Sequence, residues 1–148
     1  MSDIVRRIAE DQRAALKGGD KVRLSTLRLL SSDLKNRRIE LGRDLSEEES
    51  LAVLAKAQKK RREAEEQFRK GGRGDLADRE AAEAEIIAEY LPAPLEEQVL
   101  ERMIDTAIAE TGATSTKDLG KVMARLMPEV RGRVDGTVVS AKVRERLV

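Results

Sequence analysis

The sequence predicts an all-α fold, in which an N-terminal four-helix lobe is followed by a small three-helix C-terminal lobe. Apolar residues recur three and four positions apart along most of the chain, which is the spacing that lines one face of a helix. Glycines and capping residues separate these periodic stretches at intervals typical of helix ends. No stretch shows the alternation of apolar and polar residues that indicates a strand, and no glycine-rich phosphate loop is present.

Glycine and a capping aspartate delimit the first two helices. We expect the first helix over residues 3–17, closed by Gly18-Gly19, because glycine readily adopts the left-handed conformation that ends a helix. Asp20 is then placed to cap the second helix, and Gly42 marks its end. These signals predict the first two helices of the N-terminal lobe.

The third and fourth helices follow a capping signature. Ser46 and Glu49 have the spacing of a capping box, in which each side chain binds the backbone N–H of the other residue. The helix that begins there continues to a glycine-rich break near residue 71. We expect Asp75 or Asp78 to cap a fourth helix that runs to Leu91.

The second half of the third helix is very polar. We interpret the run Lys59-Lys60-Arg61-Arg62 as part of a solvent-exposed, ion-paired face, with an RNA contact as the alternative. Pairs of opposite charge four residues apart favour the first interpretation. These pairs are Lys59–Glu63, Arg61–Glu65 and Glu66–Lys70.

A proline pair marks the predicted boundary between the lobes. Pro92-Ala93-Pro94 cannot continue a helix, so we expect one domain over residues 1–91 and a second over residues 92–148. Charge also changes along the second domain: residues 92–113 contain one basic and five acidic residues, whereas residues 114–148 contain eight basic and four acidic residues. The final segment is therefore the basic patch of the chain.

Three helices are expected in the C-terminal lobe. The fifth begins at Glu96-Glu97, where negative charge is favourable, and stops at Gly112. The sixth spans about 115–127, because Pro128 disfavours helical geometry at the residue before it. Asp135 then caps a seventh helix over about 136–147.

The sixth helix carries the most informative pattern. Its apolar positions form one stripe, while Lys117, Lys121 and Arg125 step every four residues along another face. Gly120 and Ala124 lie between the stripes, and a glycine inside a helix costs about 1 kcal/mol relative to alanine. We therefore expect something to approach the backbone there. A sugar-phosphate backbone is one candidate, and a second helix packed against the small residues is the other.

Composition excludes many kinds of chemistry. The chain has no cysteine and no histidine, which removes thiolate and imidazole metal sites and Ser-His-Asp catalysis. We expect no metal and no cofactor, because capping and ion pairing account for the carboxylate clusters and no oxyanion loop accompanies a Ser-Lys pair. Only Phe68 and Tyr90 are aromatic, so base stacking is not available. Without an apolar stretch of about 20 residues or a signal-like N-terminus, we expect a cytoplasmic protein that does not cross a membrane.

Several segments resemble the GatB/YqeY family. They are Gly-Lys-Val-Met-Ala-Arg-Leu-Met-Pro-Glu-Val-Arg-Gly-Arg-Val-Asp-Gly at 120–136, Glu-Tyr-Leu-Pro at 89–92, Arg-Leu-Ser-Thr-Leu-Arg at 23–28 and Ile-Glu-Leu-Gly-Arg at 39–43. The resemblance covers essentially the whole chain. Free-standing members are similar to the helical and tail regions of the B subunit of the tRNA-dependent amidotransferase, whose tail helps to grip tRNA.

The resemblance implies a tRNA-binding accessory module whose family label is carbon–nitrogen ligase with glutamine as amido-N-donor. The chain lacks the catalytic part of the B subunit, so we expect no catalytic residues in it. Expected partners are tRNA and also amidotransferase subunits or an aminoacyl-tRNA synthetase. A helical protein–protein adaptor and a true glutamine-dependent ligase remain the alternatives. The expected nucleic-acid-binding residues are Lys117, Gly120, Lys121, Arg125, Arg131, Gly132, Arg133 and Lys142.

Overall fold

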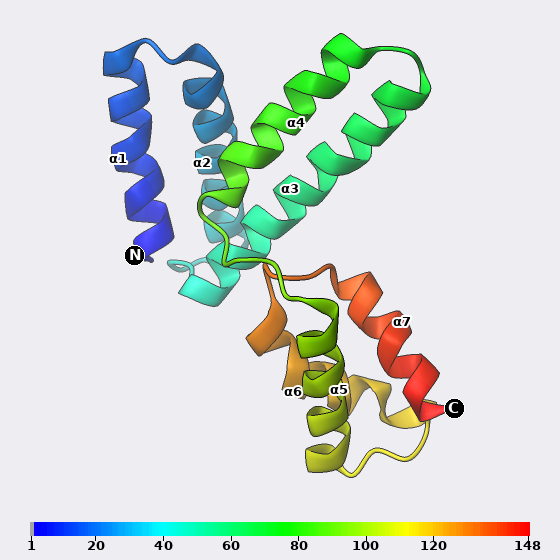
Figure 1. Cartoon of the computed structure of the whole chain (residues 1–148). Helices are drawn as coiled ribbons and strands as arrows, with labels where there is room; N and C mark the ends of the chain where they lie inside the picture. The colour runs from blue at the N-terminus through cyan, green and yellow to red at the C-terminus, as the bar shows by residue number, and fades with distance from the viewer. Residues whose placement is uncertain (1) are drawn as a thin grey trace. The chain divides into compact units, whose positions relative to one another are not determined.

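The computed structural model describes residues 2–148 and confirms the all-α fold (Figure 1). Every regular element in this range is helical. The elements are α1 (Asp3–Gly18), α2 (Lys21–Leu41), α3 (Glu47–Lys70), α4 (Gly74–Ala88), α5 (Glu97–Thr111), the short 3₁₀ helix η1 (Thr116–Asp118), α6 (Leu119–Val130) and α7 (Gly136–Leu147).

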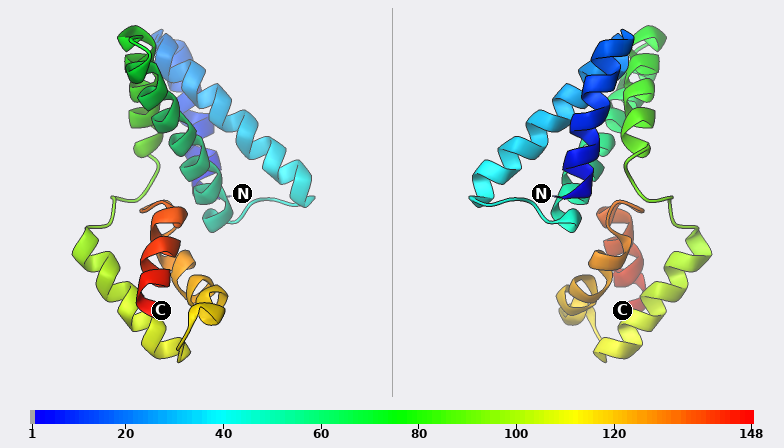
Figure 2. Two further views of the ribbon diagram at one scale, coloured as in Figure 1. Left: turned by 90° about the vertical axis from the view of Figure 1, so that its right-hand side faces the viewer. Right: turned by 90° about the vertical axis from the view of Figure 1, so that its left-hand side faces the viewer.

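The chain divides into two compact units, Met1–Pro92 and Ala93–Val148. Each unit has its own cluster of buried apolar side chains: the first cluster draws on α1 to α4 and the second on α5 to α7. The division falls within the Pro92-Ala93-Pro94 segment. This segment runs as extended, non-helical chain in both views of Figure 2. We call the two parts unit 1 and unit 2.

Unit 1 consists of two helical hairpins. α1 packs against α2, and α3 packs against α4 along much of their length (Figure 1). Leu27 and Leu30 of α2, Leu54 of α3 and Ile87 of α4 are completely buried in the shared core. Burial of such a side chain contributes about 1.5–3 kcal/mol, so these positions hold the hairpins together.

Most of the predicted caps in unit 1 are confirmed. The Asp20 carboxylate accepts a hydrogen bond from Arg23 N, and Ser46 and Glu49 form the complete capping box. Gly19 and Gly42 adopt left-handed conformations with φ of 73° and 69°. At these ends the local sequence was sufficient to predict the structure.

The predicted cap of α4 is wrong. α4 begins at Gly74, and its N-cap residue, Arg73, makes no side-chain capping bond. Asp75 lies in the first helical turn, where its carboxylate accepts hydrogen bonds from the Arg73 guanidinium at 3.1 and 3.2 Å. The turn through Gly72, with φ of 74°, brings Arg73 N to the carbonyl of Phe68 and so starts the helix before an aspartate is reached.

The predicted end of the sixth helix is also wrong. α6 continues through Pro128 to Val130, and its first turn is preceded by η1. Proline removes only one backbone donor, and the last turn is still closed by Arg131 N donating to Met127 O at 2.9 Å. Leu126 and Val130 are one turn apart and both buried, so packing of the last turn outweighs the local preference against it.

Unit 2 is a three-helix bundle. Ile104 of α5, Val122 and Val130 of α6, and Val139 and Val143 of α7 are completely buried. The segment before α5 is tied to the turn between α6 and α7 by a backbone hydrogen bond from Leu95 N to Arg133 O at 3.1 Å. Asp135 caps α7 as predicted, since its carboxylate accepts from Thr137 N at 2.9 Å.

Candidate nucleic-acid interface

The start of α6 presents an exposed basic surface. Burial of Val122 and Leu126 fixes the rotation of the helix, so that Lys117 in η1 and Gly120, Lys121 and Ala124 in α6 are all exposed. Within residues 2–148, neither lysine side chain has an ion-pair partner. We call this group of four residues the α6 surface.

Gly120 leaves open space beside the backbone of α6. A Cβ atom placed at this position would meet no other heavy atom within 4 Å. Helix packing within unit 2 therefore does not account for the small residues Gly120 and Ala124, although sequence reasoning kept that explanation open. The backbone is accessible to a partner from outside unit 2.

A hydrogen-bonded loop supports the α6 surface. The Asp118 carboxylate accepts from Thr114 N at 2.9 Å and from Ser115 N at 3.4 Å, which closes the turn before α6. These backbone hydrogen bonds, with a smaller contribution from the charge of Lys121, lower the pKa of Asp118. The Asp118 carboxylate is thus hydrogen-bonded to the loop, and Asp118 lies between Lys117 and Lys121 in the sequence.

Arg125 has two acidic partners. Its guanidinium lies 2.7 Å from the Glu110 carboxylate on α5 and 3.0 Å from the Glu129 carboxylate one turn further along α6. The hydrogen bond that Arg125 donates to Glu129 and the charge of Glu110 raise the pKa of Arg125. All three side chains are about half exposed, and such ion pairs are worth only about 0–1 kcal/mol, so a phosphate can replace either carboxylate.

Lys142 and Arg133 have structural partners in unit 2. Lys142 Nζ lies 3.0 Å from Glu97 and 3.8 Å from Glu101, and the hydrogen bond that it donates to Glu97 is the largest contribution to its raised pKa. Arg133 Nε donates to the carbonyl of Ala93 at 3.0 Å. Together with Arg146, which pairs with Asp105 at 2.7 Å, these contacts show that the acidic face of α5 neutralises part of the basic C-terminal segment.

The predicted residues fall into three groups rather than one surface. Lys117, Gly120 and Lys121 lie together at the start of α6, whereas Arg131, Gly132 and Arg133 form the turn after its end. Lys121 and Arg131 are ten residues apart, which corresponds to about 15 Å along the helix axis. Gly132 has a φ of 81°, so the turn itself requires glycine. Lys142 lies on α7, against α5.

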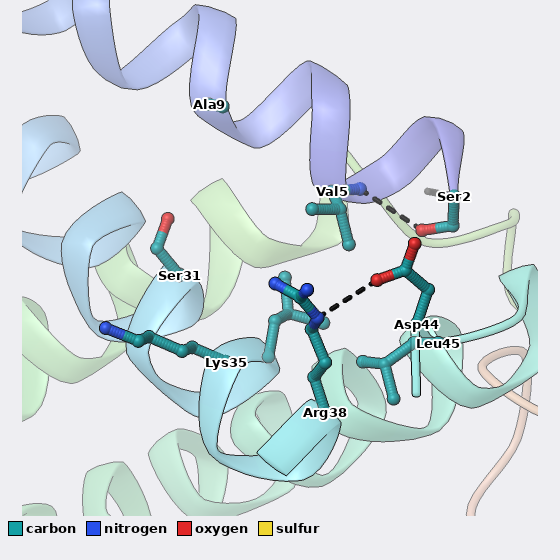
Figure 3. Close-up of a pocket in the computed structure, with 9 residues that line it drawn as sticks. Ser2, Val5, Ala9, Ser31, Lys35, Arg38, Asp44 and Leu45 are labelled. Carbon is teal, nitrogen blue, oxygen red and sulfur yellow. Dashed lines mark hydrogen bonds and ion pairs between the residues drawn. The ribbon is translucent and has the colours of Figure 1, made fainter. Parts of the chain in front are cut away.

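Sequence reasoning missed a groove in unit 1. A hollow of about 240 Å³ lies between α1, α2 and the loop that follows α2, and Figure 3 shows Val5, Ala9 and Leu45 around it. An available signal was the low amphipathicity of α2, which carries Leu29 and Ile39 on its exposed side as well as leucines in the core. Periodicity alone did not show which face of α2 is covered by other helices.

The described residues offer neither a metal site nor a membrane-spanning helix. Among residues 2–148, no group of three or more acidic, histidine or cysteine residues is arranged to hold a metal ion. In the same range, no helix is both long and apolar enough to cross a membrane.

The fold and the α6 surface together define a class of all-α protein. Two helical units are joined by a proline-containing segment, and the second unit exposes lysines beside an accessible helix backbone. The family model described as "Yqey-like protein" matches residues 5–147. The chain belongs to this family, as the sequence motifs predicted.

Curated relatives are fungal proteins that share the name "Altered inheritance of mitochondria protein 41, mitochondrial". The Pyrenophora tritici-repentis protein is 26% identical over 147 residues, which cover 96% of this chain and 80% of the relative. The Kluyveromyces lactis protein is 28% identical over 134 residues, or 85% and 72% of the two chains. The Lachancea thermotolerans protein is 37% identical over 90 residues, which cover 60% of this chain and 48% of that relative. The chain thus matches about half the length of the Lachancea protein.

Proposed function

We propose that the protein is a stand-alone tRNA-binding accessory module and that the α6 surface is its principal contact. The observation that carries this proposal is the exposed pair Lys117 and Lys121, neither of which forms an ion pair within residues 2–148, beside the open backbone at Gly120. Lysine donates hydrogen bonds to phosphate oxygens, and the absence of a Cβ at glycine allows a sugar-phosphate backbone to come close.

The remaining predicted residues have supporting roles in this proposal. Arg125 exchanges a carboxylate for a phosphate on binding, and Arg131 and Arg133 extend the contact past the end of α6. Lys142 mainly holds α7 to α5. The family resemblance is the basis for naming tRNA as the ligand and aminoacyl-tRNA amidation as the process, and we place this process in the cytoplasm on the character of the N-terminal sequence. In aminoacyl-tRNA amidation the module assists amidotransferase subunits or an aminoacyl-tRNA synthetase, and it performs no catalysis of its own.

A double variant tests the lysine pair. Lys117→Ala with Lys121→Ala should weaken binding to total tRNA and reduce the slope of log affinity against log salt by up to about two units, roughly one for each lost phosphate contact. The matched control is Arg102→Ala with Arg144→Ala, which removes the same charge from exposed positions elsewhere in unit 2. If both variants lose affinity equally, binding depends on net charge alone and the α6 surface is not the site.

Gly120→Leu tests the backbone contact without changing charge. Because there is open space at Gly120, the variant should fold with at least wild-type thermal stability. It should nevertheless bind tRNA more weakly, since the new side chain keeps the sugar-phosphate backbone away. Unchanged tRNA binding in a folded variant would contradict the proposal.

A helical adaptor is the second candidate function, because Gly120 and Ala124 form an exposed small-residue pair that no helix of unit 2 covers. Such pairs allow the backbone of a partner helix to come close. The two functions differ in salt dependence, since apolar helix docking is little affected by salt whereas phosphate binding falls steeply with it.

A further inference from the structure

Unit 1 contains a groove between α1 and α2 that has no role in the proposed function. One hollow of about 240 Å³ has the apolar side chains Val5, Leu34 and Leu45 in its lining. A second hollow of about 240 Å³ is lined partly by Leu16 and Leu24. Both hollows are also lined by Ala9, so they are neighbours between α1 and α2, and we call the two together the α1–α2 groove.

The length of the α1–α2 groove matches about three turns of a helix. Val5 and Leu16 mark its two ends on α1 and are 11 residues apart, which corresponds to about 16 Å at 1.5 Å per residue. Between them, Ser31 Oγ donates to Gln12 Oε1 at 2.9 Å, so a polar bridge separates the hollows. A ligand that fills both must carry apolar groups at two separated positions, as successive turns of an amphipathic helix do.

Basic side chains surround the apolar floor. Arg13 on α1 and Arg28 and Lys35 on α2 are exposed and line the hollows. Within residues 2–148, none of the three has an ion-pair partner. In contrast, Arg38 at one end is paired with Asp44 at 2.9 Å, as Figure 3 shows. The positive charge along the groove is therefore uncompensated and would attract an acidic ligand.

Apolar exposure indicates a protein partner rather than a nucleic acid. The Leu16 side chain lines the second hollow with 61% of its surface exposed, so a ligand seated there would bury apolar surface. A phosphate backbone would satisfy the basic rim but would leave the two apolar hollows unfilled. An amphipathic helix with acidic flanks satisfies both features.

We propose that the α1–α2 groove binds an acidic amphipathic helix of a partner protein, with apolar side chains in the two hollows and carboxylates at Arg13, Arg28 and Lys35. The site is independent of the α6 surface, so either can fail without affecting the other. The basic rim directs association, and burial of the apolar side chains supplies most of the affinity.

A pair of designed peptides tests the proposal on the full chain. The acidic peptide is an 18-residue helix with leucines at positions i, i+4, i+7 and i+11 and glutamates on both flanks, and its twin replaces each glutamate with lysine. Fluorescence anisotropy should show at least tenfold tighter binding of the acidic peptide. Amide chemical-shift changes should be centred on α1 and α2. Equal binding of the twins, no binding of either peptide, or shift changes outside α1 and α2 would overturn the proposal.

Protein variants distinguish the groove from general electrostatic attraction. Arg13→Glu with Arg28→Glu should weaken binding of the acidic peptide at least tenfold. The control Lys56→Glu with Lys60→Glu, at exposed positions of α3, should change this affinity no more than twofold. Ala9→Leu places a larger side chain at the residue that lines both hollows without changing charge, and it should weaken binding by a similar factor. Circular dichroism verifies that each variant is folded.

Two other occupants would overturn the proposal in recognisable ways. If the wild-type chain dimerises in sedimentation experiments and Arg13→Glu with Arg28→Glu abolishes the dimer, the occupant is a second copy of this chain. If the same variant loses tRNA affinity more than the Lys117→Ala, Lys121→Ala variant does, the groove is a nucleic-acid site. If Arg13→Glu with Arg28→Glu leaves the sedimentation profile and the tRNA affinity unchanged but loses peptide binding, the result supports the helix-binding groove.

Discussion

Single residues at helix starts do more in this chain than local capping. Glu49 closes the capping box with Ser46 N at 2.9 Å and also accepts two hydrogen bonds from the Arg43 guanidinium at 2.7 and 2.8 Å. The hydrogen bonds from Arg43, followed by those from Ser46, lower the pKa of Glu49 to about 2. The charged form of one glutamate thus links the loop after α2 to the start of α3.

Acid stability should depend on Glu49. In the unfolded chain a glutamate has a pKa of about 4.3, so its native-state contribution is complete above that pH and disappears as the pH falls towards 2. In Glu49→Gln the side-chain amide oxygen still accepts the capping hydrogen bond from Ser46 N, but the negative charge is removed. We expect its melting temperature to be below wild type at pH 7, with the difference shrinking between pH 4.5 and 2.

Thermal unfolding by circular dichroism at pH 7, 4 and 2.5 measures this convergence. Glu63→Gln is the control, because it removes an exposed carboxylate from the same helix. A constant difference between Glu49→Gln and wild type across the pH range would show that the charge of Glu49 is not responsible.

At the scale of the element, α6 shows how packing extends a helix past a proline. Pro128 lies in the last turn, where it has no N–H to donate, and its ring is exposed. Val130 follows two residues later and is completely buried. The helix keeps its last turn because burial of Val130 compensates for one missing hydrogen bond.

Pro128→Ala should therefore stabilise unit 2. Alanine restores the backbone donor, while the unfolded chain gains some entropy, so we expect a net increase of about 1–2 kcal/mol in the free energy of unfolding. Urea denaturation followed by circular dichroism measures the change. Pro94→Ala, outside any helix, should give no such gain. A destabilised Pro128→Ala protein would indicate that the proline fixes the turn before α7.

For the whole molecule, the important feature is that the two cores share no residue. The buried apolar cluster of unit 1 ends at Tyr90, and that of unit 2 begins at Leu100. Tyr90 is held within unit 1, since its hydroxyl donates to Asp11 and the Arg7 guanidinium lies 5.0 Å from its ring centre. Each unit thus has the core that an independently folding domain requires.

We expect residues 1–92 and residues 93–148 to fold separately. Each fragment should retain the helical circular dichroism signal of its part of the full chain, and residues 1–92 should unfold cooperatively. Summed fragment spectra that match the intact protein would support this prediction. An unfolded 1–92 fragment would show that unit 2 contributes to its stability.

The sequence by itself determined the helical class, most of the helix ends and the family, because capping, glycine conformation and periodicity are local properties of the chain. Only tertiary structure decided that α6 passes Pro128, since the burial of Val130 depends on α5 and α7. It also decided which basic residues have acidic partners: Arg125 and Lys142 meet carboxylates from α5, whereas Lys117 and Lys121 do not. These carboxylates of α5 are distant in the sequence from Arg125 and Lys142, so the two ion pairs become visible only when the helices are packed.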